Sequence, residues 1–377
     1  MPWQEHRRVD LIEKFVLRAS EPHRNMSELA REFGVSRKTG YFWLSRFSRL
    51  GVAGLKPGSH RPRRVVQTSA EVVLRIIELR KEHRFWGPKK LKALLKAELG
   101  EAPSVKTIAR ITKRLGMAPL RLTRVRKKSP LREGGLLGAQ KPNDVWTFDF
   151  KGWWNTRDGK RFEPLTVRDA ASRFILLCVH SRETFVAVKQ HCERLFLQHG
   201  LPTTIRADNG PPFAASDAMG GLSRLSAWWI SLGIEVSFSR PGTPSDNGGH
   251  ERMHADMAAE LQSEPGANTV EQQQLVDEWL RTFNHVRPHE ALGQRTPAAV
   301  YRRSKRRMKQ LKPTYPADAI VARVSGRGRI ALDGHQYFVG VNLSSMSIGI
   351  RRIDGKLHIL FFGKKLGVLQ STPQRAR

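Results

Sequence analysis

Three acidic residues of this 377-residue chain lie where carboxylates could do chemistry. Asp149 falls in an alternating, strand-like segment, Asp208 ends a second predicted strand at an Asp-Asn-Gly turn, and Glu251 lies in the first turn of a predicted helix. Three carboxylates brought together would raise one another's pKa values, and divalent cations remove that penalty. Mg²⁺ is typically bound by only a few protein carboxylates, with water and phosphate oxygens as its other ligands. Two such ions about 4 Å apart would activate the attacking oxygen and stabilise the leaving oxygen of a phosphodiester displacement.

The segments around these acids predict an α/β domain. Strands are predicted near residues 145–150, 165–167, 173–179, 203–207 and 235–238, and helices over 184–199, 218–232 and from 248 onward. This order predicts a layered sheet with helices on its faces. The side chain of Asp149 is expected on the face opposite the aromatic residues of its strand. Because the chain holds 34 acidic residues, spacing alone does not single out these three.

The charge distribution indicates a polyanionic partner. The chain has a formal net charge of +32, divided as +21 over residues 1–143, −3 over 144–300 and +14 over 301–377. A surface selected for solubility mixes both signs, whereas these two basic arms do not. Nucleic acid is the first partner expected, and an anionic membrane surface the second. The longest apolar runs, near 174–179 and 357–362, are too short to span a membrane, so we expect a cytoplasmic protein.

Two helical modules are predicted before the acidic centre. In the first, Asn25 and Ser36 can cap two helices separated by Gly34, which is a helix-turn-helix pattern. Its second helix would present Arg37, Lys38 and Tyr41 to DNA. A plain helical hairpin is the alternative. The second module is predicted as a helix over 69–84, a helix opened by Pro88 and closed by Gly100, and a helix capped by Ser104.

Basic residues in and between these modules are candidate DNA contacts. Flexible linkers are the alternative for the segments outside the modules. The candidates are Arg61, Arg63 and Arg64 in the first linker, Lys89 and Lys90 in the second module, and Arg124, Arg126, Lys127 and Lys128 in the stretch before the Gly-rich segment 134–138.

The basic C-terminal arm predicts a small β domain. A connector over 302–312 is followed by short predicted strands punctuated by glycine, which suggests a five-stranded SH3-like barrel. DNA or a partner subunit is its expected contact, with dimerisation alone as the alternative. Cys178 and Cys192 both lie in apolar segments, which predicts two core residues and excludes a cysteine-rich zinc finger.

The sequence segments around the three acids resemble those of a known family. The strings WTFDFKGWW at Asp149, RADNGPPF at Asp208, SRPGTPSDNGGHERMH at Glu251 and FNHVRPHEALGQRTPAAVY downstream occur in this order. They resemble the D,D,E transposase and retroviral-integrase superfamily, and most closely bacterial insertion-sequence transposases with tandem N-terminal helix-turn-helix modules.

This resemblance implies an RNase H-like catalytic core, a mixed sheet flanked by helices, in which Asp149, Asp208 and Glu251 bind the metal. It implies two Mg²⁺ ions, for which Mn²⁺ would substitute, and no ATP. It implies hydrolysis of one strand at each element end, followed by attack of the free 3′-OH on target DNA. The expected partners are double-stranded DNA and further copies of the chain, as a dimer or tetramer, in the nucleoid of a bacterium. Supporting positions are Asn209, Gly210, Asn247, Gly248, Arg287 and His289, with Arg252 as a DNA contact.

The resemblance also predicts a domain division and shows two departures. The expected parts are a first helix-turn-helix domain over 1–54, a basic linker over 55–67, a second helix-turn-helix domain over 68–117, a linker over 118–143, the catalytic core over 144–300, and the connector with its barrel over 301–377. The 42 residues between Asp208 and Glu251 exceed the usual 35 of retroviral integrases, which suggests a longer loop and helix start. The N-terminal His/Cys zinc module of those integrases is also missing.

Two other functions fit parts of the sequence. His250-Glu251-Arg252-Met253-His254 satisfies the H-E-x-x-H pattern of zinc proteases, although the +32 charge does not fit a protease. A catalytically silent DNA-binding regulator derived from a transposase is the second alternative, and the presence of all three acids argues against it. A further acid, Asp169, could lie near the metals, but its place in a turn favours a structural role.

Overall fold

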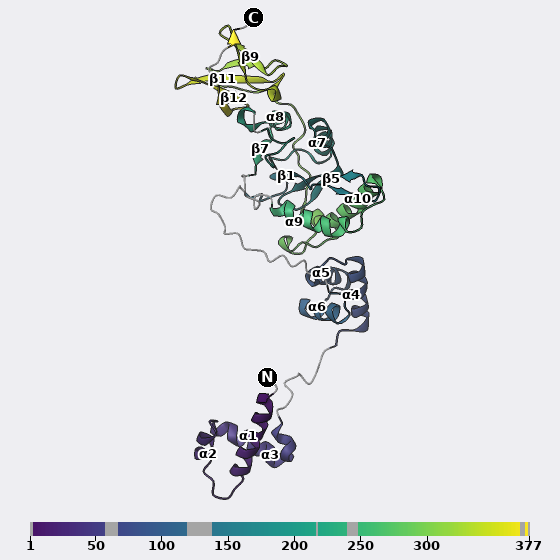
Figure 1. Cartoon of the computed structure of the whole chain (residues 1–377), viewed down its shortest axis with the longest axis vertical. Coiled ribbons are helices and arrows are strands. Elements are labelled where there is room, and N and C mark those ends of the chain that lie inside the picture. Colours follow the sequence, from purple (N-terminus) through teal and green to yellow (C-terminus); the bar gives the residue numbers. More distant parts are fainter. Residues whose placement is uncertain are drawn as a thin grey trace. The chain divides into compact units, whose positions relative to one another are not determined.

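The computed structural model describes residues 3–56, 67–118, 138–215, 218–239, 248–369 and 374–375 (Figure 1). The chain divides into two compact units, Met1–Thr68 and Ser69–Arg377, and each is described by itself. Among the described residues, no helix is both long and apolar enough to cross a bilayer.

The first unit is a three-helix domain. Its helices are α1 (Trp3–Ala19), α2 (Met26–Glu32) and α3 (Arg37–Leu50), followed by the 3₁₀ turn η1 (Gly51–Leu55). Asn25 and Ser36 cap α2 and α3 by accepting hydrogen bonds from the backbone N–H groups of Ser27 and Thr39, as predicted. Helix α1 was not expected from the sequence, and its Phe15 and Val16 are buried in the core of this unit.

Glycine has a poor helix propensity, but Gly40 in α3 is needed for packing. A Cβ atom at this position would lie 2.7 Å from the Phe15 ring and 3.1 Å from the sulfur of Met26. Helix α1 therefore approaches α3 so closely that glycine is the residue that fits.

The second unit begins with the predicted second three-helix module. It comprises α4 (Ala70–Glu82), α5 (Pro88–Leu99) and α6 (Val105–Arg114). Pro88 opens α5, Gly100 ends it, and the Ser104 side chain caps α6, as expected from the sequence. The module has its own apolar core.

A five-stranded mixed sheet follows. Its strands are β1 (Val145–Phe150), β4 (Pro164–Asp169), β5 (Ile175–His180), β6 (Thr204–Ala207) and β7 (Glu235–Phe238), in the order β5-β4-β1-β6-β7. Strands β4 and β5 form an antiparallel meander with β1, whereas β6 and β7 run parallel to it. A short hairpin, β2 (Trp154–Asn155) and β3 (Arg161–Phe162), lies between β1 and β4 in the chain.

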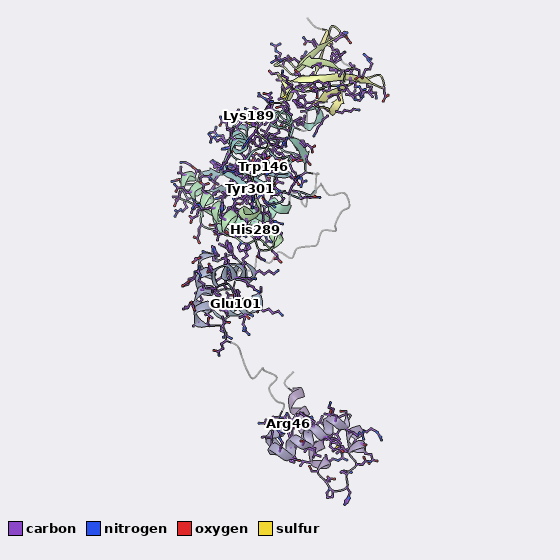
Figure 2. All side chains as sticks on the ribbon, turned by 180° about the vertical axis from the view of Figure 1, so that it is seen from behind. Arg46, Glu101, Trp146, Lys189, His289 and Tyr301 are labelled. Carbon is purple, nitrogen blue, oxygen red and sulfur yellow. The ribbon has the colours of Figure 1, made fainter. Side chains whose placement is uncertain are left out.

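Helices cover both faces of this sheet (Figure 1). On one face, Trp146 and Phe148 of β1 share a core with α7 (Phe185–His199) and α8 (Arg224–Ser231). On the other, β5 packs against α9 (Gly248–Met257), the π-helical turn η4 (Ala258–Gln262) and α10 (Thr269–His285). The turn η5 (Glu290–Leu292) and α11 (Pro297–Val300) follow, and Figure 2 labels Trp146 and the buried Tyr301 of this body.

The predicted helix over 218–232 begins later than expected. Residues Met219–Gly221 form the 3₁₀ turn η2, in which Gly220 has a φ of 68°. Helix α8 starts only at Arg224, because Ser223 and Ser226 form a reciprocal capping box there.

The segment from η2 to α8, which lies between Asp208 and Glu251, contacts the C-terminal domain. A Cβ atom on Gly220 would lie 2.9 Å from the Leu366 side chain, and Met219 approaches Gly367. Leu222 and Ile230 share an apolar cluster with that domain. This segment therefore packs against the C-terminal domain, and whether it is the extra length expected from the sequence stays a prediction.

The basic connector runs along the core in an extended conformation. The backbone N–H of Ser304 donates to His199, and that of Leu311 donates to Ser231. Arg306 donates side-chain hydrogen bonds to the carbonyls of Pro202 and Gly233. The connector therefore contributes to holding the C-terminal domain against the core.

The C-terminal domain contains the predicted short strands in two sheets. One has the order β14-β10-β9 and the other β13-β12-β11-β8. Closure into an SH3-like barrel stays a prediction. The strands are β8 (Ile320–Arg323), β9 (Arg329–Leu332), β10 (His335–Phe338), β11 (Ser347–Ile353), β12 (Lys356–Phe361), β13 (Lys364–Val368) and β14 (Gln374–Arg375), with the turn η6 (Val341–Leu343) between β10 and β11.

Candidate active site

Asp149 and Asp208 come from the same edge of the sheet. Asp149 is near the end of β1, and Asp208 directly follows β6. These strands are neighbours and parallel, with Val145 opposite Thr204, so their carboxyl ends meet. Asp149 lies on the α9 side, opposite the face to which Trp146 and Phe148 contribute, as predicted.

The charge of Glu251 acts on Asp149. It lies in the first turn of α9, and its side chain is exposed. Burial raises the pKa of Asp149, and the charges of Asp208 and Glu251 raise it further, to about 7. Burial also raises the pKa of Asp208, although the backbone N–H of Gly210 opposes the shift by donating to it. The charges of Asp208 and Glu251 therefore both act on Asp149.

The donor chemistry fits a divalent cation. Three mutually repelling carboxylates, one of them shielded from water, form a site that a hard cation would stabilise. Within the described parts of the chain, however, no three His, Cys, Asp or Glu side chains are already gathered closely enough to hold an ion. Metal binding at these acids stays a prediction.

The turn after Asp208 is fixed by its neighbours. The Asn209 side-chain amide donates to the carbonyl of Ser239, just beyond β7, and the Ser239 N–H donates to Ala207. A Cβ atom on Gly210 would lie 3.3 Å from the Asp208 carboxylate. Asn209 and Gly210 therefore support the position of Asp208.

The two histidines of the H-E-x-x-H pattern face the sheet. His250 is completely buried, and His254 lies 3.0 Å through Nε2 from the Thr166 hydroxyl. Glu251 is exposed on α9 between them. This geometry gives the zinc-protease alternative no support.

Arg287 has a buried structural position. It is 3% exposed and forms ion pairs of 2.7 Å with Asp256 and 3.1 Å with Glu260. Glu260 also accepts a hydrogen bond from the indole of Trp279. Of the two roles that the sequence left open for Arg287, these contacts favour structural support over DNA contact.

His289 and Arg252 lie in different environments. Figure 2 labels His289. Its ring packs edge-on against Phe283, and burial together with the charge of Arg287 lowers its pKa to about 3. Arg252 is exposed on α9 and lies 3.9 Å from Asp256. Arg252 thus remains available to a ligand, whereas His289 contributes to packing.

Lys89 and Lys90, expected to bind DNA, lie near core residues. Lys89 forms an exposed ion pair with Glu290. Burial and the charge of Arg287 lower the pKa of Lys90 to about 8. The Arg287 guanidinium also lies 5.8 Å from the Trp86 ring centroid, so this side of the second module faces the core.

The predicted contacts of α3 are exposed. Arg37, Lys38 and Tyr41 all lie on its surface, and Tyr41 retains 57% exposure. Their DNA contacts stay a prediction. Of the other predicted site residues, Gly248 begins α9, whereas Asn247, Arg61, Arg63, Arg64, Arg124, Arg126, Lys127 and Lys128 lie outside the described residues.

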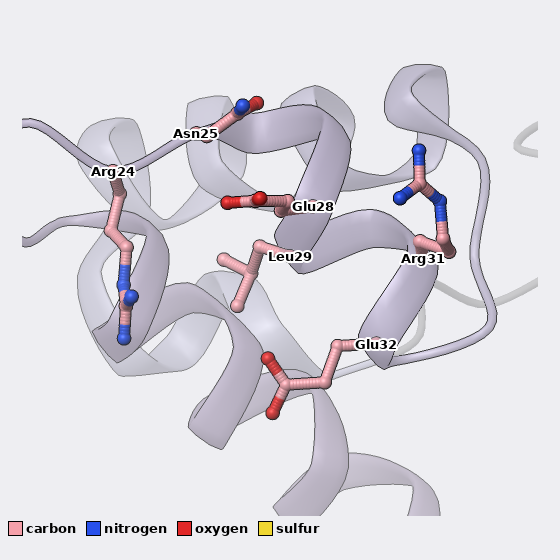
Figure 3. Close-up of a pocket in the computed structure, with 6 residues that line it drawn as sticks. All are labelled: Arg24, Asn25, Glu28, Leu29, Arg31 and Glu32. Atoms are coloured by element: carbon pink, nitrogen blue, oxygen red, sulfur yellow. The ribbon is translucent and has the colours of Figure 1, made fainter.

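Two surface pockets of the first unit contain none of the predicted catalytic acids. One, of about 380 Å³, surrounds the start of α2 (Figure 3). The other, of about 580 Å³, is an apolar groove that includes Phe15 and Trp43. Neither contributes to the site around Asp149.

Several neighbours of the acids were missed from the sequence. Arg168 of β4 is 5% exposed and lies against the start of α9, and Thr166 bonds to His254. Their alternation within β4 could have indicated that both face α9. Asp169, by contrast, accepts hydrogen bonds from Asn143 and Ser172, which confirms its structural role in the turn.

Family comparisons identify these domains. Residues 139–244 and residues 232–297 each match an integrase core domain. Residues 13–63 match a helix-turn-helix domain, and residues 39–112 match a homeodomain-like domain.

Two curated relatives come from bacterial insertion elements. An uncharacterized 39.2 kDa protein of insertion element IS476 from Xanthomonas euvesicatoria is 29% identical over 254 residues, which cover 66% of this chain and 69% of that protein. An uncharacterized 31.7 kDa protein of insertion element IS407 from Burkholderia multivorans is 26% identical over 226 residues, 59% of this chain and 78% of that protein.

Solved structures show distant likenesses. A chain of the simian T-cell lymphotropic virus intasome in complex with PP2A regulatory subunit B56 gamma is 15% identical, with a TM-score of 0.37, over 78% of this chain and 99% of that one. The catalytic core domain of BIV integrase is 23% identical, with a TM-score of 0.33, over 42% of this chain and 93% of that one.

The domain matches and the insertion-element relatives agree with the resemblance in the motifs. Helix-turn-helix domains also identify a DNA-binding protein. The chain therefore carries an integrase core preceded by helix-turn-helix domains, an organisation that fits an insertion-sequence transposase of the retroviral-integrase superfamily.

Proposed function

We propose that the protein cleaves the 3′ ends of an insertion element and joins them to target DNA. The observation that carries this proposal is the coupling of Asp208 and Glu251 to Asp149 at one end of an integrase-core sheet. In the first step, water attacks a phosphodiester and releases a 3′-OH. In the second, that 3′-OH attacks a target phosphodiester, and the target's own 3′ oxygen leaves.

Asp149, Asp208 and Glu251 would hold two Mg²⁺ ions, for which Mn²⁺ would substitute. When bound, such ions activate the attacking oxygen and neutralise charge on the leaving one. Because the pKa of Asp149 is about 7, this carboxyl must release its proton to become a full ligand near neutral pH. The tie from Asn209 to Ser239 would hold Asp208 in place during both steps.

The basic arms would hold the DNA. Arg37, Lys38 and Tyr41 on α3 have the exposure that recognition of a terminal repeat requires. Exposed lysines and arginines would contact phosphates, which makes binding weaken as salt concentration rises. Two element ends must be brought together, so the active form is proposed to be a dimer or tetramer.

The decisive experiment replaces Glu251 by Gln. With end DNA from the gene's own locus and Mg²⁺, E251Q is expected to bind DNA as the wild type does but to lose 3′-end cleavage and joining at least 100-fold. This loss is the size expected from removing charge stabilisation at a reacting centre. Glu264→Gln, at a glutamate 75% exposed in the same domain, is the matched control and should cleave normally.

The alternative function is a DNA-binding regulator that does not cleave. It shares the helix-turn-helix domains and predicts that wild-type protein binds the ends without cutting them. Equal cleavage by E251Q and the wild type would show instead that Glu251 is not a catalytic ligand.

A further inference from the structure

The face of α9 that packs on the sheet is partly polar. His250, Met253 and Met257 are at most 2% exposed, and the His254 side chain is 12% exposed. These positions follow the helical repeat, whereas Glu251 and Arg252 lie on the exposed side. Two methionines alone would allow the helix to slide or rotate, because thioether side chains adapt to their surroundings.

The first tie point is the contact between Arg168 and Gly249. A Cβ atom on Gly249 would lie 2.0 Å from Nη1 of Arg168 and 2.8 Å from both Cζ and Nη2. The guanidinium therefore lies directly against the backbone of the first turn of α9. Arg168 is itself 5% exposed on β4, so it has little room to move away.

The second tie point is the hydrogen bond between His254 and Thr166. The Thr166 hydroxyl donates to the backbone carbonyl of Asp149 at 2.8 Å, so it must accept from Nε2 of His254. Thr166 is also the residue paired with Asp149 across β1 and β4. This bond connects the second turn of α9 to the strand residue opposite Asp149. The Nδ1 atom of His254 lies 3.9 Å from Oδ2 of the Asp149 carboxylate.

We propose that Arg168, Gly249 and His254 are positioning residues that set the height and rotation of α9 over β1 and β4. The two tie points, at 249 and 254, lie on either side of Glu251 in the helix. They would therefore fix the distance between Glu251 and Asp149 before a cation binds. This inference rests on the proposed function, because it assigns these residues to the assembly of the same three acids.

Adjacent glycines give a matched pair of variants. Gly249→Ala places a methyl group into the Arg168 guanidinium, whereas a Cβ at Gly248 meets no atom of the described residues within 4 Å. We expect G249A to bind Mn²⁺, measured by electron paramagnetic resonance, about 10-fold or more weakly than the wild type. We expect G248A to lose far less. Cleavage at saturating end DNA should fall in the same order, with DNA affinity unchanged.

A double variant tests whether Arg168 is the cause. Arg168→Ala removes the group that a methyl at 249 would meet, so adding G249A to R168A should cost little further Mn²⁺ affinity. His254→Gln should retain more affinity than His254→Ala, because its amide can still donate to Thr166. Circular dichroism and thermal midpoints identify any variant that fails to fold.

Each outcome decides between the two proposals. Equal Mn²⁺ affinity for the wild type, G249A and H254A would overturn the positioning roles, while a cleavage defect of E251Q would leave the proposed function intact. Full additivity of G249A and R168A would also overturn them. Wild-type protein that binds Mn²⁺ without cleaving DNA would remove the proposed function alone. Wild-type protein that does neither would overturn both.

Discussion

The two ends of α9 are each held by a buried arginine, but in different ways. At the C-terminal end, Arg287 forms ion pairs with Asp256 and Glu260. At the N-terminal end, Arg168 lies against the backbone of Gly249. The Arg287 ion pairs neutralise the charges of Asp256 and Glu260, whereas Arg168 limits the space next to the backbone of Gly249. The end that carries Glu251 is thus positioned by close packing, and the other is stabilised by charge pairing.

The largest effect on stability is expected at the C-terminal end. Arg287→Ala would leave Asp256 and Glu260 without their buried counter-charge, and breaking such a pair costs about 3–5 kcal/mol. Urea denaturation measures this loss. Arg252→Ala is the matched control, because Arg252 also approaches Asp256 but is 67% exposed, and exposed pairs contribute less than about 1 kcal/mol. Equal losses for the two variants would remove the distinction between the two ends of α9.

The N-terminal end should instead show a pH effect. The folded pKa of Asp149 is about 7, above its ordinary value of 3.8, so the folded protein holds this proton where the unfolded chain has lost it. The contribution of Asp149 to the stability of the metal-free protein should therefore be fully present below about pH 4 and be lost as the pH rises towards 7. We expect a contribution of the order of 2 kcal/mol, measured as the free energy of unfolding against pH.

Two comparisons isolate this contribution. Asp149→Asn should remove this contribution, because an amide does not titrate, so the wild type should lose stability relative to D149N as the pH rises from 4 to 7. Adding Mg²⁺ near pH 7.5 should raise the thermal midpoint of the wild type but not of D149N, since a ligand that binds only the folded state stabilises it. A stability difference between the wild type and D149N that does not change between pH 4 and 7 would contradict the burial and charge coupling of Asp149.

Regular features of the fold were predictable from local sequence. The β1 alternation placed Asp149 opposite Trp146 and Phe148, and the Ser36 and Ser104 caps marked two helix starts. Such signals work because they depend on neighbours in the chain. The start of α8 was misjudged because the capping box at Ser223 outweighs the apolar pattern before it.

Contacts between distant elements were not predictable. Arg168 and Gly249 are 81 positions apart, and nothing in either segment specifies their approach. Lys89 and Lys90 were expected to contact DNA because they are basic and open a helix. Tertiary packing places them near Glu290 and Arg287, which the sequence did not indicate, and their DNA contacts stay a prediction. Which face of a helix remains free is decided by packing, and periodicity alone does not reveal it.

The smallest energetic effect is expected where the C-terminal end of α9 connects to the second helical module. Arg287, which binds Asp256, also approaches Trp86, and Lys89 of that module pairs with Glu290. Because Lys89 and Glu290 are 58% and 70% exposed, Lys89→Ala should change stability by less than about 1 kcal/mol. A carbodiimide should nevertheless join the two side chains directly, and peptide mass spectrometry would identify the link.

The cross-link tests whether Lys89 and Glu290 are in contact, independently of how much this pair contributes to stability. It should disappear in K89A and persist in Lys96→Ala, which changes an exposed lysine on the same helix α5. Its absence from the wild type would show that Lys89 and Glu290 do not form this contact, which would leave the ion pair of Arg84 with Glu264 between the module and the core. Its presence would show that charge pairing joins the second helical module to the segment that follows α9, whereas the packing of Arg168 on Gly249 stays within the integrase-core domain. Charge pairing tolerates small movements of its partners and close packing does not, so a shift of the second module should disturb the C-terminal end of α9 more than the end that carries Glu251.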